Sequence, residues 1–279
     1  MLNQSHVTNC PICDESNCFV YATKGQFDMP LSLSICKNDG MVFLNPRWSS
    51  FDYHRFYEND YDRYYRPKQI ISNDNESLKT KELGKRLHDQ IIKRLSKYIN
   101  DSLFNEVLEL GSGPGHILLN FSLLYNSNVS AIEPSFSCQK ELSTKKIKIV
   151  ADDLSTDWQI DLKEKFSFIY SRHVLEHTLN PLEILHKVHY ALSDEGLFYL
   201  SVPNTLQPMR SLRGFWFRIV HTYYFSEITL AALCLKSNFI VLCKHFDRGH
   251  SDMTFILKKN MSTTNSDVID LKYHFYKVL

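Results

Sequence analysis

The stretch Val107-Leu-Glu-Leu-Gly-Ser-Gly-Pro-Gly115 decides the fold of this chain. A short apolar run leads into three glycines at alternate positions, and Ile117-Leu-Leu119 then opens a helical pattern. We interpret the segment as a buried strand that turns sharply into a helix. Glycine suits such a turn, because a Cβ would block either the turn or the close approach of a ligand to the backbone. The first N–H groups of the helix are then available to an anionic or polar ligand.

A carboxylate follows at the distance typical of nucleotide-binding folds. The next apolar run, Val129-Ser-Ala-Ile-Glu133, ends in an acid about 20 residues after Gly111, and an acid at that distance accepts hydrogen bonds from ribose hydroxyls. The glycine loop and Glu133 together predict a nucleoside cofactor. A dinucleotide fingerprint would need a further glycine at position 116, where the chain has His116.

Strands alternate with helices from residue 105 onward, which predicts a parallel sheet covered on both faces. The fold class is therefore α/β, with a Rossmann-like seven-stranded sheet. The apolar runs place strands at 106–110, 128–133, 147–150, 166–171, 196–202, 239–246 and 252–258, and helices at 115–125, 135–144, 180–192 and 226–237.

Composition divides the chain into four segments. We expect a cysteine-rich module at 1–50, an aromatic and helical lid with a lead-in helix at 51–104, the cofactor-binding domain at 105–260, and a tail at 261–279. A leucine and isoleucine repeat every four residues from Leu83 to Ile99 predicts the lead-in helix.

The charge and the apolar pattern exclude several classes of protein. The formal net charge is only +1, from 32 basic and 31 acidic residues, so no global field attracts nucleic acid or an anionic membrane. No apolar run is long enough to span a bilayer, and the N-terminus lacks the pattern of a secretory signal. The seven clustered cysteines favour a reducing compartment, so we expect a cytoplasmic protein.

The N-terminal cysteines predict a metal site. Cys10 and Cys13 form a Cys-x-x-Cys pair, and Cys36 supplies a third soft ligand for tetrahedral zinc. Asp39 is the candidate fourth ligand, with Cys18 or His6 as alternatives. Such a closed site would be structural, and the competing interpretation is that the cysteines are merely buried.

Taken in the order in which they follow one another along the sequence, the motifs resemble those of class I S-adenosylmethionine-dependent methyltransferases. Glu109 to Gly115 is similar to the first motif of that family, Ile132-Glu133-Pro134 to its ribose-binding acid, and Ala151-Asp152 to its adenine contact. The similarity continues through Ser171-Arg-His-Val-Leu-Glu-His177, Leu197-Phe-Tyr-Leu-Ser-Val-Pro-Asn204 and His221-Thr-Tyr-Tyr-Phe-Ser226.

This resemblance implies a set of cofactor contacts. Glu109 would lie near the methionine end of S-adenosylmethionine, Glu133 would hold the ribose, and Asp152, or its neighbour Asp153, would contact the adenine. The residues implied to bind the cofactor are Glu109, Gly111, Gly113, Gly115, Glu133, Asp152 and Arg172.

The N-terminal segment resembles one subgroup of this family. Its members open with a Cys-x-x-Cys pair, a second such pair followed by glycine, and a Phe-Leu-Asn-Pro run. Cys10-Pro-Ile-Cys13, Cys36-Lys-Asn-Asp-Gly40 and Phe43-Leu-Asn-Pro46 follow that pattern, except that Asp39 replaces a cysteine. Many relatives in the subgroup modify sugars or other small metabolites of polysaccharide or natural-product pathways.

The segment after the fourth strand carries the candidate catalytic groups. Under the resemblance, His177 or His173 faces the gap between sulfonium and acceptor, and His221 is a further candidate. Histidine titrates near neutrality and can accept the proton of an acceptor hydroxyl. The same segment also fits the inverted zinc-protease motif H-x-x-E-H, but that chemistry needs a long continuous helix, and a strand directly precedes this motif.

Two aromatic segments are candidate walls of the acceptor pocket. The first runs from Phe51 to Tyr65, and we expect it to form a lid with Tyr57 and Tyr61 facing the pocket. The second is Arg213-Gly-Phe-Trp-Phe-Arg218. Either segment could instead serve packing or a dimer contact.

The sequence thus predicts a methyltransferase that uses S-adenosylmethionine, with structural zinc as a second candidate cofactor. The expected partner is a small hydroxylated acceptor, such as a sugar or nucleotide-sugar; we expect neither a membrane nor a nucleic acid, and the oligomeric state is left open. The alternatives are an RNA-modifying methyltransferase, a non-catalytic nucleoside-binding scaffold and, more distantly, an NAD oxidoreductase.

Overall fold

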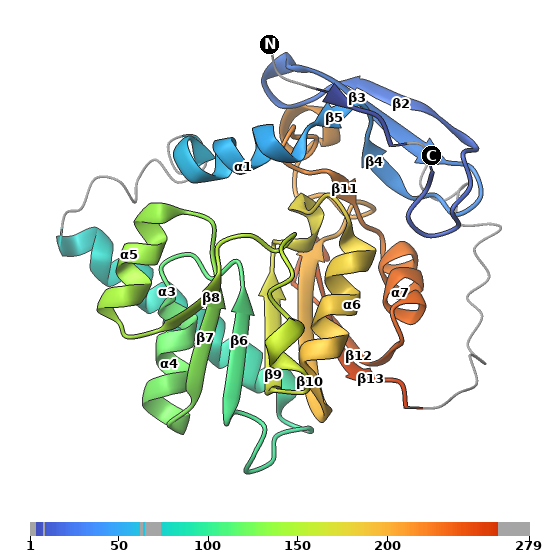
Figure 1. Cartoon of the computed structure of the whole chain (residues 1–279). Coiled ribbons are helices and arrows are strands. Elements are labelled where there is room, and N and C mark those ends of the chain that lie inside the picture. Colours follow the sequence, from blue (N-terminus) through green and yellow to red (C-terminus); the bar gives the residue numbers. More distant parts are fainter. Residues whose placement is uncertain (1–3, 8, 62–63, 65–73, 262–279) are drawn as a thin grey trace. The chain divides into compact units, whose positions relative to one another are not determined.

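The computed structural model describes residues 4–7, 9–61, 64 and 74–261 of the 279-residue chain. Its main sheet has seven strands in the order β12-β13-β10-β9-β6-β7-β8 (Figure 1). The strands are β6 (Glu106–Leu110), β7 (Asn128–Ile132), β8 (Lys148–Ala151), β9 (Phe166–Arg172), β10 (Leu192–Pro203), β12 (Phe239–Phe246) and β13 (Asp252–Lys259). The predicted α/β seven-stranded fold is confirmed, although β10 begins several residues earlier than expected.

The strand directions are mixed. β6 pairs in parallel with both β7 and β9, and β7 pairs in parallel with β8. β12 and β13 pair antiparallel at the other edge. Because parallel strands end at the same edge of a sheet, the glycine loop after β6 and Glu133 after β7 come together there.

The helices after residue 105 follow the predicted ranges closely, whereas the lead-in helix begins and ends earlier than the repeat from Leu83 to Ile99 predicts. The helices are α1 (Ser50–Asn59), α3 (Asp74–Leu95), α4 (His116–Tyr125), α5 (Phe136–Thr144), α6 (Pro181–Ala191) and α7 (Glu227–Lys236). Within the central part of the sheet, α4 contacts β6 and β7, and α5 contacts β8 (Figure 1). Val107, Leu108, Ala131 and Ile132 are fully shielded from solvent, so this part of the sheet has a continuous apolar core.

Contacts divide the chain into two compact units. One contains Ser50–Ser171 and Tyr190–Tyr199, which includes the glycine loop, Glu133 and α1. The other contains Met1–Ser49, Arg172–His189 and Leu200–Leu279, which includes the cysteines at 10, 13 and 36 and the histidines at 173, 177 and 221. The predicted tail at 261–279 lies, apart from Met261, outside the described residues.

A small antiparallel sheet forms the N-terminal part of the second unit. Its strand order is β11-β4-β3-β2, from β2 (Cys18–Lys24), β3 (Pro30–Cys36), β4 (Val42–Leu44) and β11 (Tyr223–Tyr224). Two further short strands, β1 (Gln4–Ser5) and β5 (Arg47–Trp48), pair with each other. The strand β11 comes from the far end of the sequence, yet Tyr223 pairs with Phe43 and Tyr224 with Val42.

The aromatic segment at 213–218 packs against this small sheet. Trp216 and Phe217 are buried with Leu33, Val42 and Tyr224 in one hydrophobic cluster. Its backbone forms a single π-helical turn at Leu212–Trp216. Among the described residues no helix is both long and apolar enough to cross a membrane.

Candidate functional site

The glycine loop adopts the backbone conformation that the sequence predicts. Gly111, Gly113 and Gly115 all have positive φ values, of 65°, 55° and 73°. This region is costly for residues with a Cβ, which explains the alternating glycines. The backbone N–H of Gly111 donates to the carbonyl of Ile132 at 2.8 Å, so the loop lies against the end of β7.

Glu133 ties the loop to the neighbouring strand. Among the partners of its buried carboxylate are the N–H of Gly113, which donates to Oε2 at 2.6 Å, and the N–H of Ser135, which donates to Oε1 at 3.0 Å. A carboxylate offers about four acceptor positions. A buried carboxylate beside a glycine loop is the kind of group that accepts hydrogen bonds from ribose hydroxyls, so these residues fit an adenosyl group.

The other predicted cofactor contacts differ in their surroundings. Glu109 is buried on β6. The burial of Tyr170, together with the negative charge of Glu109, raises the pKa of Tyr170. Asp152 is exposed directly after β8, whereas Asp153 accepts the N–H of Ser155 at 2.7 Å. The assignment of the adenine contact to Asp152 stays a prediction.

The predicted lid begins with α1, in the same unit as the glycine loop. His54 Nδ1 lies 3.6 Å from Asp153 Oδ2, so α1 contacts the loop after β8. Tyr57 and Tyr61 pack on one another with ring centroids 5.1 Å apart. That these two tyrosines face the acceptor stays a prediction, and residues 62–63 and 65–73 of the segment lie outside the described residues.

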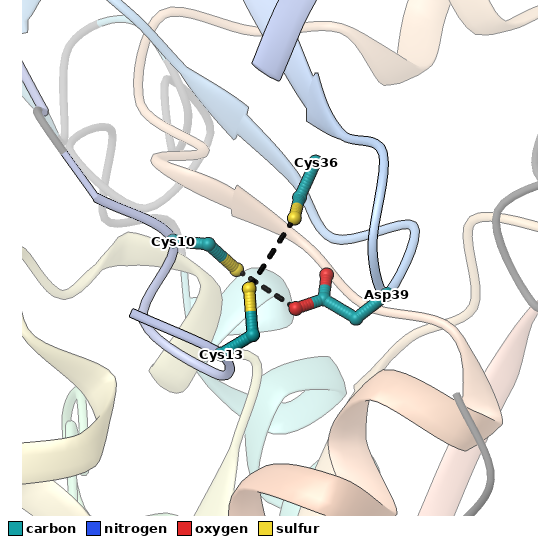
Figure 2. Close-up of side chains that lie close together, drawn as sticks. All are labelled: Cys10, Cys13, Cys36 and Asp39. Atoms are coloured by element: carbon teal, nitrogen blue, oxygen red, sulfur yellow. Dashed lines mark hydrogen bonds between the residues drawn. The ribbon is translucent and has the colours of Figure 1, made fainter. Parts of the chain in front are cut away.

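Cys10, Cys13, Cys36 and Asp39 converge in the N-terminal module (Figure 2). One ligand atom from each lies within 4.8 Å of the others. The sulfur of Cys10 lies 3.1 Å from Asp39 Oδ2, and the sulfurs of Cys13 and Cys36 are 3.5 Å apart. Around tetrahedral zinc, bonds of about 2.0–2.3 Å place neighbouring ligand atoms roughly 3.5 Å apart, so the four side chains are already near that arrangement.

The surroundings of this cluster give its thiols different pKa values. A hydrogen bond from Cys10 lowers the pKa of Cys36 to about 7, while burial raises the pKa of Cys13 to about 12. Asp39 is fully buried, and its Oδ1 accepts the N–H of Met41 at 2.8 Å, which holds Oδ2 toward Cys10. Cys18, an alternative ligand in the sequence, lies outside the converging set.

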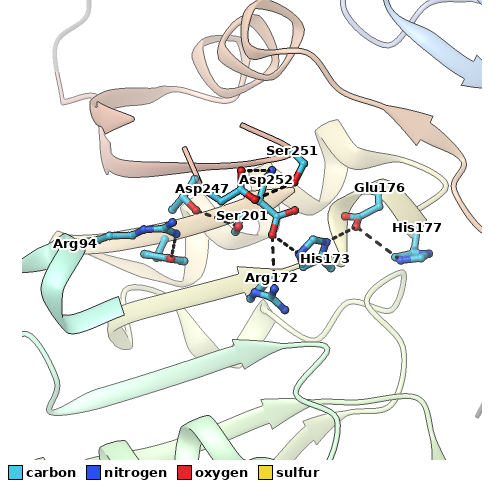
Figure 3. Close-up of polar contacts among 11 residues, drawn as sticks. Arg94, Arg172, His173, Glu176, His177, Ser201, Asp247, Ser251 and Asp252 are labelled. Carbon is cyan, nitrogen blue, oxygen red and sulfur yellow. Dashed lines mark hydrogen bonds and ion pairs between the residues drawn. The ribbon is translucent and has the colours of Figure 1, made fainter. Parts of the chain in front are cut away.

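The three predicted catalytic histidines gather around one buried acid, Glu176 (Figure 3 for His173 and His177). Glu176 Oε1 lies 3.4 Å from His173 Nδ1 and 3.8 Å from His177 Nε2. The other nitrogen of His173 lies 3.1 Å from Asp252, which Arg172 contacts at 3.6 Å. Side chains of alternating charge thus follow one another from Arg172 to Glu176. The cofactor contact of Arg172 stays a prediction.

The histidines differ in protonation. Burial alone would lower the pKa of His173, but Asp252 and Glu176 raise it to about 9, so this ring is cationic at neutral pH. Burial lowers the pKa of His177. Burial also lowers the pKa of His221 well below its usual value, and the nearby His177 and Arg218 lower it further. His177 and His221 are therefore neutral near pH 7 and carry a basic nitrogen.

Thr222 positions His221 beside this acid. The Thr222 N–H donates to the carbonyl of Glu176 at 2.8 Å, and its hydroxyl donates to the carbonyl of Thr178 at 2.6 Å. The carbonyl of Thr222 in turn accepts the N–H of Leu44 at 2.9 Å. The H-x-x-E-H motif itself lies on a loop and one 3-10 turn, Leu175–His177, so the long helix of a zinc protease is absent from this described segment.

A family model for a methyltransferase domain matches residues 80–244, more than half of the chain. The chain belongs to this family. It is an S-adenosylmethionine-dependent methyltransferase, and the matched range contains the glycine loop, Glu133 and all three histidines of the cluster. None of the curated proteins matches the sequence.

Solved structures share the fold of the methyltransferase. One is the 1,6-didemethyltoxoflavin-N1-methyltransferase of Burkholderia thailandensis, which is 17% identical, with a TM-score of 0.56 over 85% of this chain and 99% of that one. Another is an S-adenosylmethionine-dependent methyltransferase of Clostridium acetobutylicum, 13% identical, with a TM-score of 0.51 over 71% of this chain and 96% of that one. Identities this low show a common fold.

Two residues of the methyltransferase were not predicted as parts of the site. Glu176 is inside the H-x-x-E-H motif, but only the zinc-protease interpretation predicts a role for it. Its burial at 2% exposure among three histidines is what marks it. Thr222 has no local signal, because its role depends on contacts with residues distant in sequence.

Proposed function

We propose that this methyltransferase methylates a hydroxyl of a small acceptor of the sugar or nucleotide-sugar class. The cluster around Glu176 carries the proposal, because it combines a buried acid with two neutral histidines after the fourth predicted strand. S-adenosylmethionine supplies an electrophilic methyl group on a positively charged sulfur. Glu133 and the backbone of Gly111, Gly113 and Gly115 would hold its adenosyl part, with Glu109 toward its methionine part.

The acceptor hydroxyl loses its proton at the cluster. His177 Nδ1 lies 2.8 Å from the carbonyl of Val220, which favours the tautomer with the proton on Nδ1 and the basic lone pair on Nε2. That nitrogen faces Glu176, so the proton is removed beside a carboxylate that stabilises the resulting positive charge. His173 is already cationic and orients Glu176.

A panel of sugars and nucleotide-sugars tests the proposal, with release of S-adenosylhomocysteine as the readout. We expect His177→Gln to lower kcat by about 10²–10⁴-fold, the usual contribution of acid–base catalysis, without changing the affinity for S-adenosylhomocysteine. We also expect wild-type activity to be full above pH 6.5 and to fall as the pH drops through the lowered pKa of His177.

His186, an exposed histidine on α6, provides the matched control, since His186→Gln should retain full activity. Turnover of bulk RNA but of no small acceptor would contradict the proposal in favour of RNA modification. Binding of S-adenosylhomocysteine without turnover of any acceptor would favour the scaffold.

The proposal includes one structural zinc at Cys10, Cys13, Cys36 and Asp39. It also places the protein in the cytoplasm, where reducing conditions keep thiols available to a metal. The convergence of three sulfurs and one carboxylate supports the site. A closed four-ligand site leaves no open position for chemistry, so the zinc would stabilise the turn between β3 and β4.

Cobalt substitution tests the zinc proposal selectively, because only the cysteine cluster can give a thiolate-to-cobalt charge-transfer band. We expect one equivalent of Co²⁺ to produce that band in the wild type and Cys36→Ser to lose it, with a lower melting temperature. Cys243→Ser, at a half-buried cysteine on β12, should keep the band. A wild-type protein without the band would show that the cysteines are merely buried.

A further inference from the structure

Glu176 is a buried acid whose side-chain contacts among the described residues are longer than a good hydrogen bond. It is 2% exposed, and neither Oε1 nor Oε2 accepts a hydrogen bond. Its polar side-chain contacts are the two longer ones from Oε1, to His173 at 3.4 Å and to His177 at 3.8 Å. His173 meets Oε1 from one side, and a second cation or donor would stabilise a carboxylate this deeply buried further.

His177 and His221 present nitrogen lone pairs to the same point. Together with Glu176 they offer one ligand atom each, and these three atoms lie within 4.8 Å of one another. Two lone-pair nitrogens and a carboxylate repel each other at this separation. The arrangement is satisfied when a positive centre lies between them.

Backbone carbonyls fix the opposite side of each ring. His177 Nδ1 lies 2.8 Å from the carbonyl of Val220, and the ring of His221 hydrogen-bonds the backbone of Trp216. Metal-binding histidines in proteins typically donate their second N–H to a carbonyl or carboxylate in this way, which fixes the tautomer and aims the other nitrogen at the metal. The Thr222 contacts hold the two histidine segments together.

We propose that Glu176, His177 and His221 bind a divalent first-row transition-metal cation. Imidazole nitrogens with one carboxylate suit such ions, and three protein ligands leave positions open for a further molecule. Bonds of about 2.0–2.2 Å would draw the ligand atoms to roughly 3–3.5 Å from one another, a small contraction from the present separations.

This inference rests on the proposed function, in that the acceptor hydroxyl binds at the same cluster. A cation there would withdraw electron density from the acceptor oxygen and ease the loss of its proton. His177 would then act as a ligand, and solvent or a second group would receive the proton. His173 would remain outside the ligand set, because its second nitrogen contacts Asp252.

Titration with Mn²⁺ followed by electron paramagnetic resonance tests the site directly, because binding removes the signal of the free ion. Mn²⁺ prefers oxygen and nitrogen ligands to thiolates, which discriminates against the cysteine cluster. We expect one equivalent to bind the wild type, and Glu176→Gln and His221→Gln each to weaken binding by more than about 100-fold, the upper end for loss of a supporting contact.

Two control variants should retain Mn²⁺ binding. Glu183→Gln and His186→Gln alter exposed residues of α6. The affinity of each ligand variant for S-adenosylhomocysteine shows that it is folded. If a variant does not fold, displacement of Mn²⁺ from the wild type by Zn²⁺ still reports on the site.

The outcomes separate this inference from the proposed function. Absence of Mn²⁺ binding by a wild type that methylates a sugar, and that depends on His177 for it, would overturn the metal site and leave His177 as the base. Unchanged binding in both ligand variants would overturn it as well. Specific binding by a protein that methylates no hydroxylated acceptor would support the metal site and contradict the proposed function.

Discussion

We expect the Glu133→Ala variant to lose the rise in melting temperature that S-adenosylhomocysteine gives the wild type. A ligand at 100 times its Kd stabilises the native state by about 2.7 kcal/mol, which for a protein of this size raises the melting temperature by roughly 5–10 °C. The carboxylate of Glu133 anchors Gly113, and under the proposed function it would also accept hydrogen bonds from the ribose. Loss of one or two hydrogen bonds to a charged group costs about 1.5–3 kcal/mol each, enough to remove the shift.

The matched control is Glu141→Ala, which removes an exposed carboxylate on α5 paired with Lys145. It should keep the full shift. The melting temperature of each variant without ligand separates a loss of binding from a loss of folding, because Glu133 also satisfies the N–H of Ser135. A shift in Glu133→Ala equal to that of the wild type would remove Glu133 from the cofactor site.

The second large effect concerns stability. We expect Gly115→Ala to destabilise the protein by about 2–5 kcal/mol, combining about 1–2 kcal/mol for a Cβ at positive φ with about 1–3 kcal/mol for overpacking. Gly115 has φ 73°, and its Cβ would lie 2.4 Å from Leu142 Cδ2 and 2.7 Å from Ile147 Cδ1. Both neighbours are buried, so neither can move aside freely. Urea denaturation measures the change.

Gly249→Ala is the control for this substitution. No atom lies within 4 Å of the Cβ that alanine would add there, so we expect a change of less than about 0.5 kcal/mol. Equal stability of the two variants would show that the loop after β6 has a different backbone from the one described. The loss in Gly115→Ala should also weaken cofactor binding, since the same residue precedes α4.

The proximity of the glycine loop and Glu133 was predictable because its signals are local. Gly111 to Gly115 lie within one turn, and Glu133 directly follows β7, which pairs in parallel with β6. Apolar runs placed most of the other strands, and the helices after residue 105, to within a few residues. β10 begins at Leu192, earlier than the predicted strand at 196–202, because it follows α6 directly. The sequence had indicated a short loop between this helix and the strand.

The rest of the candidate site depended on contacts between distant segments. A two-residue strand such as Tyr223–Tyr224 has no alternating pattern to detect, and its pairing with β4 is set by packing of the whole small sheet. For the same reason the role of Thr222 was not foreseen. Glu176 shows a different limit, because the sequence reveals its neighbours in the motif but not its burial.

The origin of β11 restricts how the N-terminal segment can be exchanged between relatives. A chimera that imports residues 1–49 from another protein would keep a native Tyr223–Tyr224 strand whose hydrogen-bonding partner is foreign. A functional graft would have to carry both pieces, or the loop that presents His221 would lose its register. The cysteine-bearing segment therefore depends for one of its strand pairings on a portion of the chain almost two hundred positions downstream.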